Sequence, residues 1–344
     1  MHHLQLRILS DPSTPATRSI RRAAASSAIE LLGNEPAAGA VQPEMALIVS
    51  SYQKARHLQL VLASIALQQS VAGKIELVVS DDGSTDETPS IVEQFKLEAE
   101  FPVRFTTHRH RTFQLARCRN EGTAASIAPY LVFLDGDCVL PPDFALEHLR
   151  RRKPGTVMTG DCYRLSVETS ARVDESVIRT GAFLNWAPPG EVRRLAKQHR
   201  KARLYNLIRH RSKPRVLGGN VGVWRADFER VNGYDEDFEG WGCEDDDLGF
   251  RLRKAGLRIE SIRRWTRAYH LWHTPDATAP ARWREGPNVQ KLLGGNRPMF
   301  AVNGLHKRGF DNIAGLADAA EPAILPFQRP VDRLLVGSAA RRAA

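Results

Sequence analysis

Short apolar runs alternate with helical patterns over the first half of this chain, and this alternation constrains the fold more than any other feature. The runs predict buried strands at 45–50, 75–79, 103–107 and 130–134. The segments between them have apolar residues three or four apart and predict helices near 58–67, 88–97 and 113–125. Such alternation is typical of βαβ units, so we predict an α/β fold with a mostly parallel sheet.

Acidic motifs follow two of these strands directly. Asp81-Asp82-Gly83-Ser84 follows the second strand, and Asp135-Gly136-Asp137 follows the fourth. Open α/β sheets bind ligands at the carboxyl ends of their strands. Two carboxylates on either side of a glycine can reach one divalent ion and the phosphates that it bridges. At Asp81 and Asp82, spacing alone favours a simple turn and helix N-cap over ligand contact.

The second half of the chain has weaker signals. We expect a strand at 156–163, a long irregular basic section to Pro214, a glycine-rich apolar segment at 216–224 and strands near 257–262 and 268–273. Residues 1–43 are predicted to be an N-terminal extension with one helix at 19–32, and 276–344 a C-terminal extension. The region between them, 44–275, is predicted to be the functional domain.

Four consecutive acids, Glu244 to Asp247, follow Trp241 in a glycine-rich stretch. Leu248, Leu252 and Ala255 come next at helical spacing, so the acids occupy the first turn of a helix. Exposed N–H groups and the helix dipole favour ionised carboxylates there. Capping accounts for one or two of the four. An Asp held ionised at this position can also take a proton from an incoming hydroxyl.

The basic residues are unevenly distributed. The net charge is +10, and ten Lys or Arg residues with no acid lie between Val192 and Arg215. This segment is either a solvated surface or a surface that attracts a diphosphate, an acidic glycan, a lipid-phosphate or an anionic membrane. Tyr205 is its single aromatic residue, so we expect no nucleic-acid binding.

Several common classes of protein are not expected. No run approaches the roughly 18 to 20 apolar residues of a membrane helix, and the first residues lack the apolar core of a secretory signal. None of the four cysteines forms a C-x-x-C pair, so a zinc site is not predicted. We expect a cytoplasmic protein, with peripheral membrane contact left open.

The motifs taken together resemble the family 2 glycosyltransferases of the GT-A fold, a Rossmann-like three-layer α/β/α architecture. The resemblance rests on four stretches in this order: VSSYQKARHL, VVSDDGSTDETP, FLDGDCVLPPDF and GGNVGVWRADFERVNGYDEDFEGWGCEDDDLGFRLRKAG. The last is similar to the signature shared by β-1,4-galactosyltransferases and chondroitin polymerases. It departs from that signature at Cys243, where a glycine is common. The resemblance implies a nucleotide-binding half at 44–140 and an acceptor-binding half at 141–275.

The resemblance also implies roles for individual residues. The nucleotide-sugar donor would contact Ser50, Ser51, Asp81, Asp82, Arg119, Asn120, Asp135, Gly219 and Asn220. Mn²⁺ or Mg²⁺ would be held by Asp135, Asp137 and His270, with His273 as the alternate. Asp245 would be the general base, and the acceptor would contact Trp241, Glu244 and Asp246.

One base and one metal site serve a single displacement, which inverts the anomeric carbon. We therefore expect a metal-dependent, inverting transferase that moves a hexose or N-acetylhexosamine from a nucleotide-diphosphate sugar, of the UDP type, to a glycan or glycoconjugate. That acceptor could be acidic or linked to a lipid phosphate. The alternative is a non-catalytic glycan- or anion-binding protein on the same scaffold. The presence of base, metal ligands and nucleoside acids favours the enzyme.

Overall fold

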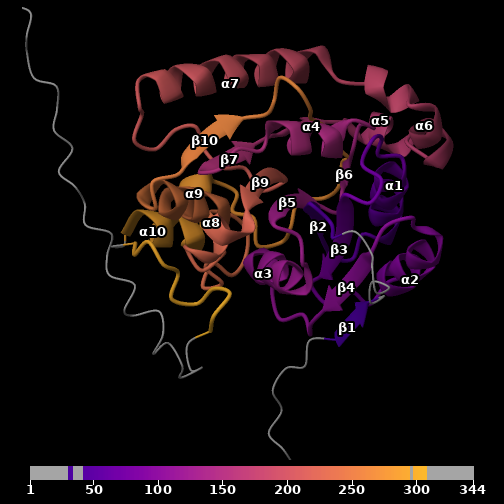
Figure 1. Ribbon diagram of the computed structural model, residues 1–344, viewed down its shortest axis with the longest axis horizontal. Helices are drawn as coiled ribbons and strands as arrows, with labels where there is room; N and C mark the ends of the chain where they lie inside the picture. Colours follow the sequence, from indigo (N-terminus) through magenta and orange to yellow (C-terminus); the bar gives the residue numbers. More distant parts are fainter. Residues whose placement is uncertain (1–29, 34–41, 295–296, 308–344) are drawn as a thin grey trace, which may run out of the picture.

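The computed structural model describes residues 30–33, 42–294 and 297–307 of the 344-residue chain. Its centre is an eight-stranded sheet (Figure 1). The strands are β1 (Glu30–Gly33), β2 (Met45–Ser51), β3 (Ile75–Asp81), β4 (Val103–Thr107), β5 (Tyr130–Asp135), β7 (Thr156–Thr159), β9 (Asn220–Trp224) and β10 (Arg258–Ser261). Their order across the sheet is β1-β4-β3-β2-β5-β9-β7-β10.

The predicted α/β fold with a mostly parallel sheet is confirmed. Strands β4, β3, β2 and β5 are parallel neighbours, and β7 is parallel to β10. Strand β9 runs antiparallel between β5 and β7, and β1 is antiparallel to β4. The register places Ser51 opposite Asp81 and Ser50 opposite Asp135. The polar ends of three central strands therefore meet at one edge of the sheet.

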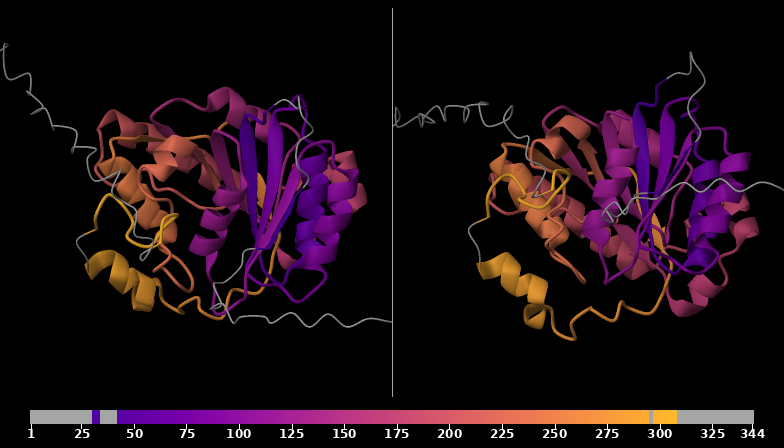
Figure 2. Two further views of the ribbon diagram at one scale, coloured as in Figure 1. Left: turned by 60° about the horizontal axis from the view of Figure 1, so that its bottom comes forward. Right: turned by 90° about the horizontal axis from the view of Figure 1, so that it is seen from below.

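Helices cover both faces of the sheet, and Figure 2 shows the sheet between these two layers. One face packs against α1 (Ala55–Ala66), α2 (Thr88–Glu98) and α4 (Phe144–Arg151). The other packs against α3 (Leu115–Ala125), α8 (Arg225–Glu229) and α9 (Glu244–Lys254). Side chains of β2 alternate between the two cores: Met45, Leu47 and Val49 join the first, and Ala46 and Ile48 the second.

A second, three-stranded sheet lies beside the first core. It consists of β6 (Cys138–Val139), β8 (Cys162–Arg164) and β11 (Ala268–His270), with β11 in the middle. The remaining elements are α5 (Val167–Ala171), α6 (Glu175–Thr180), the 3-10 turns η1 (Ala182–Asn185) and η2 (Trp283–Glu285), α7 (Pro189–Leu207) and α10 (Pro287–Gly294). Because β6 follows Asp137 and β11 ends at His270, this sheet brings two distant segments to one place.

Three local predictions were wrong. Residues 30–33, expected to end a helix, form strand β1, and the rest of that predicted helix lies outside the described residues. The segment 156–163 is two strands in different sheets, because the chain turns at Gly160, whose N–H is bonded to the Asn220 carbonyl and which has no room for a side chain there. The basic section expected to be irregular is mostly helical, and its longest helix is the 19-residue α7.

Among the described residues, no helix combines the length and the apolar composition needed to cross a bilayer.

Candidate active site

The carboxyl ends of the central strands open into a cavity of about 590 Å³. It is lined by Ser50 and Ser51 from β2, by Asp82 after β3, by Asp135 and Asp137 at β5, and by more distant residues that include Lys54, Trp241, His270 and His273. The hydroxyls of Ser50 and Ser51 are buried and, within the described part of the chain, have no hydrogen-bond partner. The cavity thus combines several carboxylates with hydroxyls that are still available to a ligand.

Two histidines converge on the Asp137 carboxylate. His270 Nε2 lies 3.4 Å from one oxygen and His273 Nε2 lies 3.0 Å from the other. Lys54 Nζ is 2.9 Å from the second oxygen. Burial would raise the pKa of Asp137, but the hydrogen bond with His273 and the charges of His270 and Lys54 lower it well below its usual range. The hydrogen bond to Asp137 in turn raises the pKa of His273.

These groups fit a divalent cation. Ligand atoms of Asp137, His270 and His273 all lie within 4.8 Å of one another, and so do those of Asp135, Asp137 and Cys138. Carboxylate oxygens suit Mg²⁺ and Mn²⁺, and imidazole nitrogens also ligate first-row metals. The pairing of β11 with β6, which puts His270 opposite Cys138, positions one histidine. The donor set therefore contains one carboxylate and both histidines, with Asp135 nearby.

Arg119 connects the strand-end acids to the acidic cluster. It lies on α3, and its side chain is only 1% exposed. Its Nη1 lies 2.8 Å from Asp245 Oδ1 and 3.2 Å from Glu244 Oε1, and its Nη2 lies 3.1 Å from Asp135 Oδ1. Partial burial raises the pKa of Asp135, and the Arg119 charge opposes this. One buried guanidinium therefore neutralises part of the charge of three carboxylates.

The four consecutive acids begin α9 as predicted, and each has a different environment. Asp245 accepts hydrogen bonds from Gly218 N (2.7 Å) and the Tyr234 hydroxyl (3.2 Å) as well as from Arg119. Glu244 is 5% exposed, and burial followed by the charge of Asp245 raises its pKa to about 8.

The last two acids of the cluster have Arg partners. Asp246 forms a two-pronged ion pair with Arg215. Asp247 is buried against Arg251, with 2.7 Å between Oδ2 and Nε. Asp245 is thus the acid of this turn that is partly exposed and held by three donors.

Two residues before the acids shape the mouth of the site. Cys243 has φ +75°, the left-handed conformation in which glycine is favoured. It is the N-cap residue of α9, so this conformation sets the direction in which the chain enters the helix. Trp241 is 43% exposed and lines the cavity. Its backbone is fixed by a bond from its N–H to Thr278 and by Asn288, which donates to its carbonyl.

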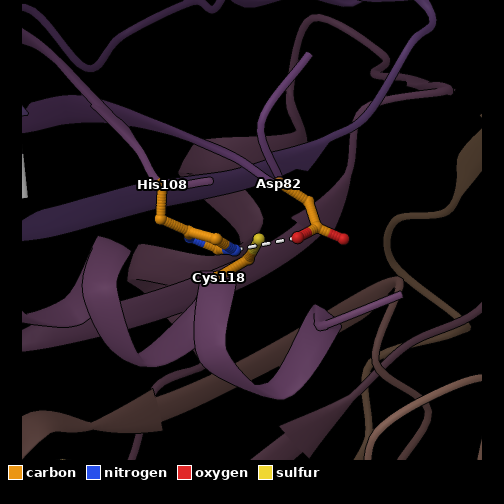
Figure 3. A group of neighbouring side chains, drawn as sticks. All are labelled: Asp82, His108 and Cys118. Atoms are coloured by element: carbon orange, nitrogen blue, oxygen red, sulfur yellow. Dashed lines mark hydrogen bonds and ion pairs between the residues drawn. The ribbon is translucent and has the colours of Figure 1, made fainter. Parts of the chain in front are cut away.

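A buried histidine holds Asp82 (Figure 3). His108 Nε2 lies 2.8 Å from Asp82 Oδ1, and His108 Nδ1 lies 2.7 Å from Glu121 Oε2. The Gln114 N–H donates to the other Asp82 oxygen at 3.0 Å. Burial alone would lower the pKa of His108, but its hydrogen bonds to Asp82 and Glu121 raise it to about 9. His108 itself is only 6% exposed.

Comparison with known proteins decides the family. Residues 46–226 match the model of glycosyl transferase family 2, and residues 198–274 match the model described as the N-terminal domain of galactosyltransferase. The chain belongs to glycosyl transferase family 2. The predicted resemblance is thereby confirmed, including its galactosyltransferase-like part.

Curated relatives of this family 2 chain are sugar transferases of different kinds. It is 31% identical to validoxylamine A glucosyltransferase of Streptomyces hygroscopicus subsp. jinggangensis (strain 5008) over 241 residues, which are 66% of this chain and 56% of that protein. It is 24% identical to chondroitin synthase of Escherichia coli over 239 residues, 66% of this chain and 34% of that protein. The chain thus spans about half the length, or less, of these relatives.

A solved structure supports the GT-A fold. The mannosyltransferase PcManGT from Pyrobaculum calidifontis, solved with GDP-Man and Mn²⁺, superposes with a TM-score of 0.51 at 18% identity. The match covers 75% of this chain and 66% of that one. At this identity the likeness concerns the fold alone, and it agrees with the predicted architecture.

Not every residue assigned from the family 2 resemblance faces the cavity. Asp81 is fully buried and accepts hydrogen bonds from Gly83 N, Ser84 and Thr107, as a turn residue does. Asn120 joins α3 to the backbone of Tyr234. Asn220 is buried against His148, with 2.9 Å between Oδ1 and Nε2.

Gly219 does lie at the site, because a side-chain carbon built there would come 2.6 Å from Asp135 Oδ2. The close approach of backbone to carboxylate requires a residue without a side chain.

Sequence reasoning missed several residues of this site. Lys54 and Tyr234 were not singled out, although both stand inside the motifs that carry the family resemblance. Arg215 was counted only as part of the basic segment, and its ion pair with Asp246 was not foreseen. Tyr52, whose ring stacks on His110 at 4.1 Å and lines the cavity, was also missed.

Proposed function

We propose that this family 2 protein is an inverting, metal-dependent glycosyltransferase that moves a hexose or N-acetylhexosamine from a nucleotide-diphosphate sugar to a sugar hydroxyl of a glycan or glycoconjugate. The observation that carries the proposal is the bridge through Arg119. It joins Asp245, the proposed base, to Asp135 beside the proposed metal ligands. Base and metal site thus belong to one side-chain network: Asp135 and Asp137 line the cavity, and Asp245, which is not one of its lining residues, is linked to Asp135 through Arg119.

In this proposal the donor lies over the strand ends. Ser50 and Ser51 have buried hydroxyls that no other described residue bonds, and Asp82 is fixed by His108, so these three residues suit the hydrogen-bonding groups of a nucleoside. The stacked pair of Tyr52 and His110 offers an aromatic wall for a base, with uracil the proposed one.

The diphosphate would be held at the metal site. Asp137, His270 and His273 are the proposed ligands of Mn²⁺ or Mg²⁺, together with Asp135. When bound, such an ion neutralises the charge that develops on the leaving diphosphate. Lys54, which is 2.9 Å from Asp137, adds a positive charge from the protein at the same place.

The acceptor would enter from the α9 side. Asp245 takes the proton of the attacking hydroxyl while Gly218 N, Tyr234 and Arg119 keep its carboxylate in place. Trp241 provides an exposed ring against which a sugar can stack. Glu244 and Asp246 are the proposed contacts to acceptor hydroxyls. Because Arg215 forms an ion pair with Asp246, an acceptor must bind Asp246 next to the Arg215 side chain or displace it.

A single displacement follows from this arrangement. The base deprotonates the acceptor oxygen as it attacks the anomeric carbon, and the nucleotide diphosphate leaves from the opposite face. With one base and no second carboxylate assigned as a nucleophile, the product has inverted configuration. An α-linked donor would therefore give a β-linkage.

The test is an assay of nucleotide release. The protein would be incubated with Mn²⁺, a panel of UDP-, GDP- and dTDP-sugars and a panel of mono- and oligosaccharide acceptors. We expect acceptor-dependent release of a nucleotide diphosphate from at least one donor, and loss of that release with EDTA. Glycan binding without turnover of any donor would instead support the non-catalytic alternative.

A further inference from the structure

The longest helix of the structure, α7, is attached to the rest of the protein along a narrow stripe. Its buried residues are Leu195, His199 and Ala202, which are spaced as one side of a helix. His199 approaches Ser261, and Asn206 donates to the Ile259 carbonyl, so the stripe is held against β10. Figure 1 shows α7 along the outer border of the molecule. The remaining faces of the helix are open to solvent.

The open side of α7 is strongly basic. Five exposed residues contribute to it: Arg193, Lys197, Arg200, Lys201 and Arg203. Within residues 30–33, 42–294 and 297–307, none of the five forms an ion pair or a hydrogen bond through its side chain. Arg194, on the attached side of the same helix, is by contrast paired with Glu191 and Asp161. Unpaired charges of one sign on one helix face attract an anionic partner.

The same side also exposes large apolar residues at its C-terminal end. Leu204 is 53% exposed, Leu207 is 81% exposed and Ile208 is 58% exposed. Exposed apolar side chains do not stabilise a helix that is surrounded by water. An acidic polysaccharide would give them no apolar surface to contact. Apolar residues interleaved with Lys and Arg are the pattern of helices that lie in a membrane interface.

We propose that the exposed side of α7 docks onto an anionic lipid surface. The five basic residues would contact lipid phosphates, and Leu204, Leu207 and Ile208 would enter the boundary between headgroups and acyl chains. An isolated basic residue near such a surface contributes about 1 kcal/mol, so several together give reversible binding.

The chain segment that follows α7 leads to the acceptor end of the candidate active site. The chain leaves α7 through residues 208–219, and in this segment Arg215 pairs with Asp246 while Gly218 N donates to Asp245. In the proposed orientation a membrane bound to α7 would be connected to the proposed base through this one segment. This orientation suits an acceptor that is itself anchored in the lipid layer.

Vesicle co-sedimentation tests the proposal with the full chain. Vesicles of phosphatidylcholine alone would be compared with vesicles of phosphatidylcholine and phosphatidylglycerol. We expect binding to the anionic vesicles only, and weaker binding as salt is added. Reversing two charges in R200E/K201E should weaken binding at least tenfold, by the roughly 1 kcal/mol per basic residue. L207S/I208S should also weaken it, with a smaller change in salt dependence.

The matched control is K74E/R282E, which makes the same change in net charge at two exposed positions away from α7. It should bind like the wild type. Failure of the wild type to bind anionic vesicles, or equal binding by R200E/K201E, would overturn the proposal. So would heparin binding as tight as vesicle binding together with no effect of L207S/I208S, because that result indicates a polyanion site.

Failure of this proposal is separable from failure of the proposed function. Transfer to a small water-soluble acceptor is expected to be the same in R200E/K201E and wild type, since neither residue contacts the cavity.

Discussion

Arg119 Nη1 lies 2.8 Å from Asp245 Oδ1, although the two residues are 126 positions apart in the chain. The second nitrogen of the same guanidinium reaches Asp135. Glu244 is buried, and Asp135 and Asp245 are only partly exposed, so these three carboxylates would repel one another without a cation among them. The planar fork of an arginine can serve two of them at once, which a lysine cannot. The integrity of the site should therefore depend on this side chain.

Replacement of Arg119 by lysine should cost both stability and activity. We expect Arg119→Lys to lower the free energy of unfolding by about 2–4 kcal/mol, because it leaves buried carboxylates without a full set of partners. Urea unfolding followed by circular dichroism would measure this. Arg117→Lys, two residues earlier on α3, where Arg117 is 18% exposed and paired with Glu121, is the control and should change stability by less than about 1 kcal/mol. Equal effects of the two variants would contradict the assigned role.

Asp245→Asn should abolish most transfer while leaving the donor site intact. Removing a general base typically costs about 10²- to 10⁴-fold in rate. We expect a loss of this size in kcat, with donor affinity by calorimetry close to that of the wild type. Asp246→Asn should instead raise KM for the acceptor with a smaller change in kcat. If Asp245→Asn retained full transfer, Asp245 would not be the base.

The cation site can be probed without any sugar. Loss of a residue that only supports a metal ligand typically weakens metal binding about tenfold. We therefore expect at least this loss of Mn²⁺ affinity in each of three variants: Asp137→Ala, His270→Ala and His273→Ala. Lys54→Met removes a positive charge 2.9 Å from Asp137 and should tighten Mn²⁺ binding. Isothermal titration with MnCl₂ measures all four. Unchanged affinity in His273→Ala would leave His270 as the single histidine ligand.

The sequence predicted those parts of the fold that depend on local pattern. Strand β4 and the starts of β2, β3 and β5 lie where the apolar runs placed them, because buried parallel strands need continuous apolar residues. The division of 156–163 into β7 and β8 depends on the close approach of Gly160 to Asn220, which no local pattern shows. Helix α7 was missed because only three of its 19 residues are buried, which leaves a weak apolar pattern.

The site was predicted less completely for the same reason. Motifs indicated which acids matter, but the bridge through Arg119 and the hold of His108 on Asp82 are contacts between segments far apart in the chain. Cys243 illustrates a further limit. The family resemblance shows a glycine to be common there, but only the backbone, with φ +75°, supplies the physical reason.

The last prediction concerns pH and His108. An imidazole in the unfolded chain has a pKa near 6.5, and the contacts with Asp82 and Glu121 raise the pKa of His108 to about 9 in the folded protein. Between these two pH values the folded chain holds a proton that the unfolded chain has released. The stabilisation from His108 is therefore fully present below pH 6.5 and is lost as pH rises through 9.

The variant His108→Gln isolates this contribution. Below pH 6.5 the wild type should exceed it in free energy of unfolding by about 1–3 kcal/mol, and the difference should shrink above pH 9. Urea titrations at both ends of this range measure it, with His210→Gln, at an exposed position, as the control that should follow the wild type throughout. A constant offset between His108→Gln and wild type at all pH values would mean that His108 acts by packing rather than by its charge. Because Asp82 is a proposed donor contact, the same variant should also raise KM for the nucleotide sugar more than it lowers kcat.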